Sequence, residues 1–471
     1  MPPLTDRSRP AAGASRADRF ALRRAAVAAL VSLGALAEPA VAQGPAPDSS
    51  APAADVYTAV QRAQAAERAG DAAGYLRHVE RVAQLAPDHP AAHLYMARAR
   101  ALTGNPAGAV AALEALAPLG AATDLAADSA FRALRGTPAF ERVVSTLAAN
   151  AGPLVRSDTA FALADPDLVP ESVAYDPQYQ TFYAGSLAKY KIVRVGPSGA
   201  TTDFVTLGPE GAGRVVGIKV DPVRRRLWAA TYAFDSTAAA SRTGERLRAA
   251  LDVFDLATGK QLRRYEPTDQ LTVAHFFNDV ALDPDGGVYL TDQGNDAVLR
   301  VRAGRGGALG DSLERVSLGE ERRFTYPNGL DVSPDGRRLY VAHVEGISVL
   351  DLARGGPART LDHPVGATTA SIDGLYACMR SLVVIQRVVG FDQVTRLKLD
   401  ASGQRATGVE ALERRHPAYE SPTTGVVVRD ALYYIPNSQV GRLAGAREPL
   451  RPAASPHPSV VLKLPIGERC R

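Results

Sequence analysis

A short sequence pattern recurs six times in the second part of the chain, and this repeat constrains the fold more than any other feature. Each copy is a strand-like run that ends in a turn and is followed by a second strand-like run, such as TFYAGS or RLYVAH. The copies begin at Glu171, Val216, Asn278, Asn328, Asp373 and Thr424, at intervals of 45, 62, 50, 45 and 51 residues. Six all-β units of this length are typical of a six-bladed β-propeller.

The runs that flank the repeats predict how the ring closes. A strand-like run at 158–164 precedes the first unit, and another at 460–465 ends the last one. We expect these two strands to share the last blade, because this pairing removes the open sheet edges of the ring. The propeller is therefore placed at residues 155–466.

Residues 55–150 have a different composition, rich in Ala, Leu and Arg, with apolar residues at helical spacing. Gly70-Asp71 and Gly104-Asn105 lie 34 residues apart, and each is followed by a helix that ends in Leu-Ala-Pro. A 34-residue helix-turn-helix period resembles the tetratricopeptide repeat. The predicted fold class is thus an all-β six-bladed β-propeller preceded by a small all-α tetratricopeptide-like helical domain.

Two full helical units are fewer than such arrays usually need for stability, so we expect this domain to be stabilised by packing against the propeller. It is interpreted as a structural cap, with docking of a partner protein as the alternative. None of the repeat positions lies in it, so its deletion is expected to leave metal binding by the propeller intact.

The first 42 residues are typical of a cleavable signal peptide. Arg23-Arg24 precede an apolar run at 25–37, and Ala40-Val41-Ala42 is a small-x-small cleavage site. The run has 13 residues, fewer than the roughly 20 that span a bilayer. Residues 43–54 are rich in Pro, Ala and Ser and predict a flexible leader. We expect a periplasmic or secreted protein with no membrane span.

The charge of the mature chain argues against a nucleic-acid partner. The chain has 54 basic and 50 acidic residues, but the first 42 residues hold six Arg against three acidic side chains. Cleavage leaves 48 basic and 47 acidic residues. A nucleic-acid binder normally concentrates basic residues, so this class is excluded.

Two cysteines, Cys378 and Cys470, are too few for a disulfide scaffold. The preferred interpretation is a buried Cys378 and a loose Cys470 at the chain end. A bridge that ties down the C-terminus is the alternative.

The first position of each repeat carries the strongest chemical signal. The first strand of every propeller blade lines the central channel, so the six repeat positions form a ring. Buried carboxylates without a partner cost several kcal/mol, and a hard cation would supply the partner. Oxygen ligands without His or Cys suit calcium and not zinc. The expected metal ligands are Glu171, Asn278, Asn328 and Asp373. A hydrogen-bonded polar plug with ordered water is the alternative.

This ring resembles that of the gluconolactonase, regucalcin (senescence marker protein) and luciferin-regenerating enzyme family, with paraoxonases and diisopropyl fluorophosphatase as more distant relatives. That family places a Glu in the first blade, Asn in the third and fourth, and Asp in the fifth. The resemblance implies one catalytic divalent cation, usually calcium, and hydrolysis of lactones or phosphotriesters. It also implies that Asp373 acts as base or nucleophile.

The chain departs from gluconolactonases at one position. These enzymes hold their polyol substrate with an Arg two residues before the third-blade Asn, where this chain has Phe276. The substitution favours a more apolar ester, lactone or aryl substrate over sugar lactones.

Candidate proton carriers are sought where the second strands return toward the ligand ring. These strand ends are Ser186, Thr231, Asp292, His343, Gln386 and Asn437. Of these, Asp292 and His343 could titrate usefully near the ring, and His275 lies three residues before Asn278. We therefore name His343 and His275, with Asp373, as candidate catalytic residues. The longest interval, between the second and third units, adds a segment at 233–250 on the same face, interpreted as a lid or as an inert loop.

The sequence thus predicts an exported, calcium-dependent or other divalent-metal-dependent hydrolase of lactones, esters or phosphotriesters. The alternative is a non-catalytic propeller that binds a ligand or partner protein, with a structural ion and a helical docking domain. A weaker third possibility is a condensation enzyme that resembles strictosidine synthase.

Overall fold

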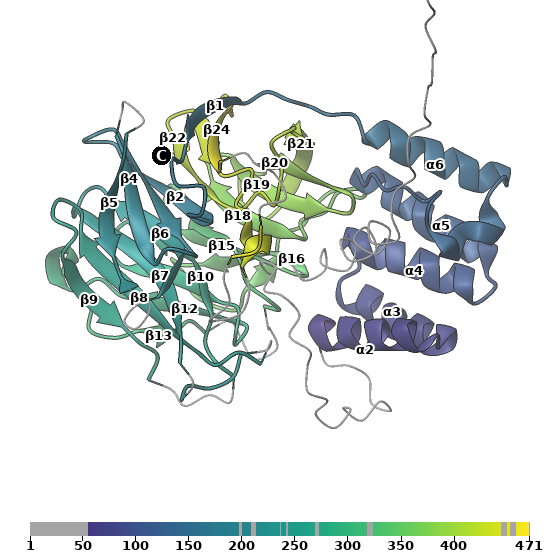
Figure 1. Ribbon diagram of the computed structural model, residues 1–471, viewed down its shortest axis with the longest axis horizontal. Coiled ribbons are helices and arrows are strands. Elements are labelled where there is room, and N and C mark those ends of the chain that lie inside the picture. Colours follow the sequence, from purple (N-terminus) through teal and green to yellow (C-terminus); the bar gives the residue numbers. More distant parts are fainter. Residues whose placement is uncertain are drawn as a thin grey trace, which may run out of the picture.

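The computed structural model describes residues 55–196, 200–208, 213–235, 237–241, 244–268, 273–317, 324–443, 450–452 and 458–470. The predicted signal peptide and leader lie outside these residues. A helical region is followed by six four-stranded antiparallel sheets around one axis, with the helices on one side of the ring (Figure 1). The predicted fold class is confirmed.

Each sheet is one blade, and its strands run outward from the axis in chain order, except in the last blade. The inner strands are β2 (Pro170–Asp176), β6 (Arg214–Asp221), β10 (Phe277–Leu282), β14 (Leu330–Val332), β18 (Ile372–Ala377) and β22 (Gly425–Val428). The second strands are β3 (Thr181–Ser186), β7 (Arg226–Phe234), β11 (Val288–Asp292), β15 (Arg338–His343), β19 (Ser381–Val388) and β23 (Ala431–Tyr434). Each inner strand contacts the next, and β22 contacts β2, so the ring is closed.

The outer half of each blade completes the sheets. The third strands are β4 (Lys191–Val195), β8 (Leu247–Asp255), β12 (Ala297–Val301), β16 (Gly346–Asp351), β20 (Phe391–Leu399) and β24 (Val460–Pro465). The outermost strands are β5 (Thr201–Thr206), β9 (Gln261–Tyr265), β13 (Glu314–Arg315), β17 (Arg359–Thr360), β21 (Ala406–Arg414) and β1 (Asp158–Ala162).

The last blade combines both ends of the propeller, as the flanking strands predicted. Strand β1 pairs antiparallel with β24, with Asp158 opposite Lys463 and Ala162 opposite Val460. The N-terminal strand therefore closes the ring from outside. Apolar layers between adjacent blades hold the ring together, such as Trp228 and Leu251 of the second blade packed with Phe277 and Leu290 of the third.

The helical region repeats the same local design 34 residues apart. Its helices are α2 (Val56–Ala69), α3 (Ala72–Leu85), α4 (Pro90–Leu102), α5 (Pro106–Leu116) and α6 (Pro138–Asn150). Gly70 and Gly104 follow α2 and α4 with φ of 71° and 76°, a backbone conformation that favours glycine. Asp71 and Asn105 then cap α3 and α5, each accepting a 2.8 Å hydrogen bond from a backbone N–H three residues on. None of the helices in the described part of the chain is long and apolar enough to cross a membrane.

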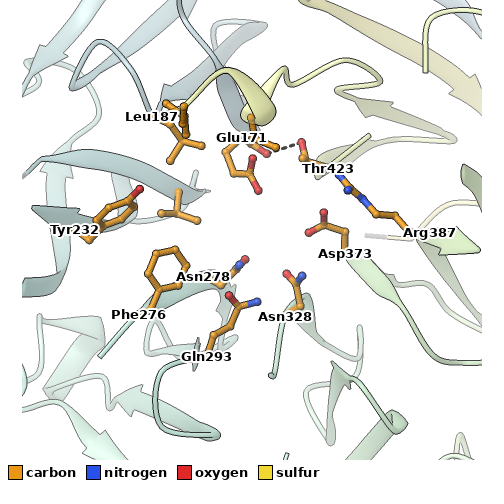
Figure 2. Close-up of a pocket in the computed structure, with 13 residues that line it drawn as sticks. Glu171, Leu187, Tyr232, Phe276, Asn278, Gln293, Asn328, Asp373, Arg387 and Thr423 are labelled. Atoms are coloured by element: carbon orange, nitrogen blue, oxygen red, sulfur yellow. Dashed lines mark hydrogen bonds between the residues drawn. The ribbon is translucent and has the colours of Figure 1, made fainter. Parts of the chain in front are cut away.

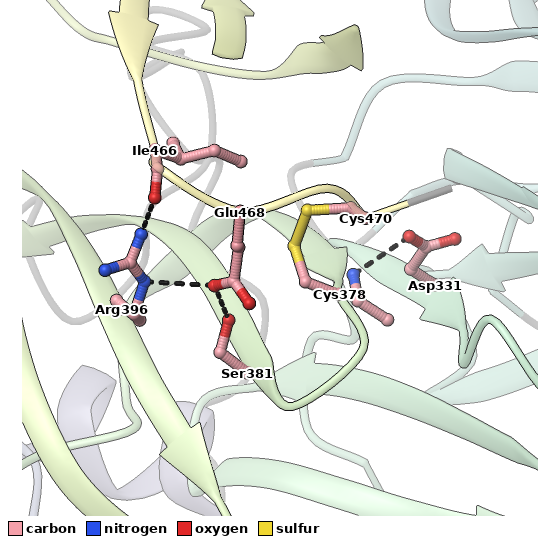
Figure 3. The surroundings of a disulfide bond; sticks show 8 residues. Asp331, Cys378, Ser381, Arg396, Ile466, Glu468 and Cys470 are labelled. Carbon is pink, nitrogen blue, oxygen red and sulfur yellow. Dashed lines mark hydrogen bonds and ion pairs between the residues drawn. A yellow bond between two sulfur atoms is a disulfide. The ribbon is translucent and has the colours of Figure 1, made fainter. Parts of the chain in front are cut away.

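The two cysteines form a disulfide, so the preferred interpretation of an unpaired Cys470 is wrong (Figure 3). After β24 the chain returns to the turn between β18 and β19, where Cys378 lies. Glu468 accepts a hydrogen bond from Ser381 and pairs with Arg396 at 3.0 Å, and both cysteines are buried. The bridge spans 92 residues and fixes the end of the chain to the fifth blade.

Candidate metal centre

The four predicted ligands come together in one pocket at the channel mouth (Figure 2). Its polar lining residues are Glu171, Asn278, Gln293, Asn328, Asp373, Arg387 and Thr423. Its apolar lining residues are Leu187, Val216, Tyr232, Phe276, Val440 and Leu443. The carboxylates and amides come from the first, third, fourth and fifth blades, as the repeat predicted.

A local irregularity of the inner strands aims the ligands into the channel. The pairing of β2 with β3 shifts register between Pro170 and Val173, and equivalent shifts occur in β6, β10 and β18. A β-bulge leaves one residue unpaired and re-aims its side chain, and bulges occur often beside active sites. Glu171, Asn278 and Asp373 all lie within these shifts.

The sixth blade has the same irregularity, one residue before the predicted repeat position. The backbone N–H of Thr423 donates to the carbonyl of Ile435, and the N–H of Ile435 donates to the carbonyl of Thr424, both at 3.1 Å, so two residues oppose one. Thr423, and not the predicted Thr424, is therefore the side chain of this blade that lines the pocket. Both hydroxyls donate 2.9 Å hydrogen bonds to the backbone carbonyl of Glu171. The sixth blade therefore anchors the first ligand strand.

Several oxygens in the pocket have no hydrogen-bond partner. Glu171 Oε2, Asn328 Oδ1, Asp373 Oδ1 and Gln293 Oε1 are buried without one. Unpaired buried oxygens are expensive, and a divalent cation with oxygen ligands would satisfy several of them together. No group of three or more His, Cys, Asp or Glu is placed to hold a metal among the described residues. The ring residues fit a hard cation because two amides complement two carboxylates.

The raised pKa values of the two ring carboxylates also favour a bound cation. Burial raises the pKa of Glu171 well above its usual range, and the charge of Asp373 adds to this shift. Burial also raises the pKa of Asp373 to about 6, while Arg387 and a hydrogen bond from Asn328 act in the opposite direction. Two negative charges are thus held together in a place that lacks enough positive charge.

Neither candidate histidine lines the pocket. The Nδ1 of His343 lies 2.7 Å from Glu345 Oε2 and its Nε2 lies 2.8 Å from Ser348 Oγ, so both ring nitrogens are hydrogen-bonded within the fourth blade. The Nδ1 of His275 lies 2.6 Å from Asp292 Oδ2. Asp292 is fully buried and also accepts hydrogen bonds from the backbone N–H groups of Phe276 and Gly294. These contacts position the segment before Asn278.

Four pocket residues lie one position beyond the strand ends predicted from the sequence. Leu187, Tyr232, Gln293 and Arg387 line the pocket, and each directly follows a strand end that the sequence had selected. The selected residues Ser186, Thr231, Asp292 and Gln386 pair with the residue before the ring position. Directly opposed residues share one face of a sheet, and successive residues alternate faces. The side chain that enters the channel is therefore the next one along.

The segment between β7 and β8 lies on the face of the pocket, as its length predicted. Ala239 packs in the same apolar cluster as Tyr232 and Val440, which line the pocket. The backbone N–H of Ala274 donates to the carbonyl of Ala240 at 2.9 Å. The segment is therefore tied to the chain that leads to Asn278.

Comparisons with known proteins agree with this arrangement. Residues 169–377 match the model of the family described as SMP-30/Gluconolactonase/LRE-like region. This span contains all four ring residues that carry carboxylate or amide oxygens. No curated protein matches the chain in sequence.

Several solved structures resemble the propeller in overall fold. A gluconolactonase from Xanthomonas campestris is 16% identical over 67% of this chain and 98% of its own, with a TM-score of 0.42. A calcium-binding protein, regucalcin, from Agrobacterium tumefaciens is 17% identical over 66% of this chain and 94% of its own, with a TM-score of 0.43. A luciferin-regenerating enzyme is 14% identical over 68% and 98%, also with a TM-score of 0.43. These likenesses concern the fold alone.

Proposed function

We propose, on the premise that residues 169–377 match the SMP-30/Gluconolactonase/LRE-like family model, that the protein is a divalent-metal-dependent hydrolase of lactones, esters or phosphotriesters. The observation that carries this proposal is the set of unpartnered buried oxygens on Glu171, Asn328 and Asp373, which converge in one pocket. Such a set is costly unless it serves a ligand.

The residues that would hold the cation are Glu171, Asn278, Asn328 and Asp373, and their all-oxygen chemistry favours Ca²⁺. Bound there, the cation would polarise the carbonyl or phosphoryl oxygen of a substrate and stabilise the negative charge that grows on it. The side chains of Leu187, Tyr232 and Phe276 form an apolar wall for the rest of the substrate.

Asp373 is the one named catalytic candidate that lies in the pocket. We propose that its carboxylate orients the attacking water or attacks the substrate itself. Proton transfer by His343 or His275 stays a prediction, and no step of the proposal depends on it.

We also propose that the protein is exported. The signal-peptide pattern at residues 1–42 carries this proposal, and the Cys378–Cys470 disulfide supports it, because such bonds persist in oxidising compartments. Sequencing of the mature N-terminus should begin at Gln43. An uncleaved chain in the periplasm would overturn this assignment.

A non-catalytic propeller with a structural ion is the second candidate. No histidine is among the described residues that line the pocket, which favours this candidate, because histidine is the most frequent proton carrier in enzymes at neutral pH. Docking of a partner protein by the helical region stays a prediction.

One experiment separates the two functions. The purified chain is assayed on lactones, aryl esters and phosphotriesters, with and without a chelator, and its Ca²⁺ affinity is measured by calorimetry. Hydrolysis that chelation abolishes and Ca²⁺ restores supports the hydrolase. Ca²⁺ binding without hydrolysis of any substrate supports the non-catalytic candidate. Full activity in the chelated protein contradicts the metal-dependent mechanism.

A further inference from the structure

The pocket has two chemically different sides. In Figure 2, Tyr232 and Phe276 lie on one side, and Arg387 and Thr423 lie on the opposite side, with Asp373 between the ring amides and Arg387. A substrate that fits both sides would have an apolar body and a polar group at the far end.

Arg387 is the only cationic side chain among the described residues that line this pocket. It lies near the end of β19, where its backbone N–H donates to the carbonyl of Ser371 at 2.9 Å. Its Nε is buried without a hydrogen-bond partner. Its charge lowers the pKa of Glu171 and of Asp373, so the guanidinium lies close to both carboxylates.

A cation in the ring would change the charge balance around Arg387. Glu171 and Asp373 would become ligands of a doubly charged ion, and their negative charge would be compensated by it. Asp392, opposite Arg387 on β20, is the remaining nearby carboxylate, and burial raises its pKa. The guanidinium would then face the pocket with donors to spare. Its planar fork matches the two oxygens of a carboxylate or phosphate.

We propose that Arg387 forms an anion-binding subsite beside the metal centre, and that the preferred substrates are small esters or lactones that carry a carboxylate next to an apolar body. This proposal rests on the hydrolase function proposed above. Its subsite lies on the fifth blade, across the pocket from Phe276.

The test compares two substrates of one shape, 3-acetoxybenzoate and the neutral 3-acetoxybenzamide. The wild-type chain should favour the benzoate in kcat/KM by about tenfold to a hundredfold, as expected for a hydrogen bond to a charged group. Arg387→Met should bring the ratio of the two kcat/KM values close to one, and Arg387→Lys should give an intermediate ratio. Arg380→Met, an exposed arginine at the other end of β19, should keep the wild-type ratio.

The outcomes are distinguishable from failure of the proposed function. Equal kcat/KM for both substrates in the wild type, or an unchanged ratio in Arg387→Met, overturns the subsite. If neither ester is hydrolysed, the panel of lactones, aryl esters and phosphotriesters decides the hydrolase proposal, and calorimetry with 3-hydroxybenzoate and 3-hydroxybenzamide decides the subsite alone. Arg387→Met should bind Ca²⁺ at least as tightly as the wild type, because it loses a like charge, and this shows that the ring is intact.

A different set of contacts carries a second inference, about the helical region. His89 caps α4 through Nδ1, which accepts from the backbone N–H of Ala91, so its proton lies on Nε2. That Nε2 donates to the hydroxyl of Ser371 at 2.8 Å. The backbone N–H of Ala122 donates to the carbonyl of Val389 at 3.2 Å. Ser371 directly precedes β18 and Val389 directly follows β19, so the helical region holds both strands that carry Asp373 and Arg387.

The fourth blade is held in a similar way. The rings of Tyr57 in α2 and Tyr326 are 5.6 Å apart. Tyr326 and Ser371 lie two residues before Asn328 and Asp373, so both contacts of the helical region reach the segment that leads into a ring residue. Their positive φ, 55° and 56°, is shared by Val169 and Ser421 at the same place in the first and sixth blades and is a property of the blades.

We infer that the helical region positions the ligands of the fourth and fifth blades, with His89 as a positioning residue for Asp373. Deletion of residues 55–150 should then weaken metal binding. The sequence, which places no ring residue in that span, predicted the opposite.

The test uses full-length variants at the His89–Ser371 contact. In His89→Asn the shorter side chain keeps an acceptor for the N–H of Ala91 and no longer reaches Ser371. His89→Asn and Ser371→Ala should each weaken Ca²⁺ binding severalfold, and the double variant should be no weaker than either one. Leu113→Ala, in the core of the helical region, should lower the Tm and leave Ca²⁺ affinity unchanged.

Hydrogen exchange supplies a readout that needs no metal. The amides of β18 should exchange faster in His89→Asn than in the wild type, and no faster in Leu113→Ala. A lower Tm with unchanged Ca²⁺ affinity and unchanged exchange in β18 would show that the contact is merely structural and would overturn the inference.

Discussion

Two pairs of buried carboxylates on the inner strands of the propeller differ in what satisfies them. Asp279 accepts from the backbone N–H of Val280 at 2.8 Å, and Asp331 accepts from those of Val332 and Ala377 at 3.0 Å each. Glu171 Oε2 and Asp373 Oδ1 have no such donor. The first pair joins neighbouring blades, and the second pair faces the pocket. Burial alone therefore does not distinguish the two pairs of carboxylates, whereas the missing donor does.

The largest effect is expected when one carboxylate of each pair is replaced by its amide. Asp373→Asn should weaken Ca²⁺ binding roughly a hundredfold and abolish hydrolysis, because ligand charge sets the affinity of such sites. Asp331→Asn, the matched control, should change Ca²⁺ affinity little and lower the free energy of unfolding by roughly 1 to 3 kcal/mol, since an amide NH₂ replaces an acceptor. Calorimetry and denaturant unfolding measure the two effects. Similar Ca²⁺ affinities in both variants would contradict the distinction.

The next largest effect is expected from loss of the Cys378–Cys470 disulfide, which lies near Asp331 (Figure 3). Replacing both cysteines by Ser should cost roughly 2 to 4 kcal/mol of stability, because the bridge closes a long loop. Ca²⁺ affinity should stay as in the wild type. A large loss of affinity would show that the two ends of the inner strands are coupled.

Replacing a carboxylate in the pocket should have a smaller effect on stability, and this effect should be stabilising. In metal-free protein, Glu171→Gln should raise the free energy of unfolding by about 1 kcal/mol, because it removes a charge whose burial is uncompensated. Asp279→Asn should lower it. The comparison is wrong if both substitutions destabilise the metal-free protein to the same extent.

The smallest expected effect is a pH dependence from a buried group outside both pairs. Burial, with a smaller contribution from His93, lowers the pKa of His89 to about 3. Asp88, which pairs with His363 at 3.4 Å, is the nearby carboxylate. In the unfolded chain the His89 imidazole is protonated below about pH 6.5, whereas in the folded chain it stays neutral down to about pH 3. Stability should therefore fall as pH decreases from about 6.5 toward 3. Thermal unfolding of His89→Asn should show a weaker decline than the wild type over this range.

The sequence predicted the ring because the feature that builds it is local. Each inner strand brings one residue to the channel, and Asn278, Asn328 and Asp373 stand at the same point of their repeats. Blade number follows from the same periodicity, and closure of the ring follows from the strand-like runs that flank it.

The features that the sequence did not predict depend on β-bulges and on contacts between distant segments, which the pattern of one repeat does not contain. A bulge adds one residue to the inner strand, so Arg387 enters the pocket where Gln386 was expected. Cys470 meets Cys378 only because the chain end after the sixth blade lies against the neighbouring fifth blade. His89 and Ser371 are 282 residues apart, and neither has a sequence signal for the other.

The outermost strand of the last blade has a consequence for how the protein is made. Because Asp158 pairs with Lys463, the last blade cannot form until residues 460–465 have left the ribosome. The helical region, whose contacts are mostly local, can fold far earlier. A ring that stays open during synthesis leaves the propeller part of the nascent chain unfolded for longer, until its two end strands can pair.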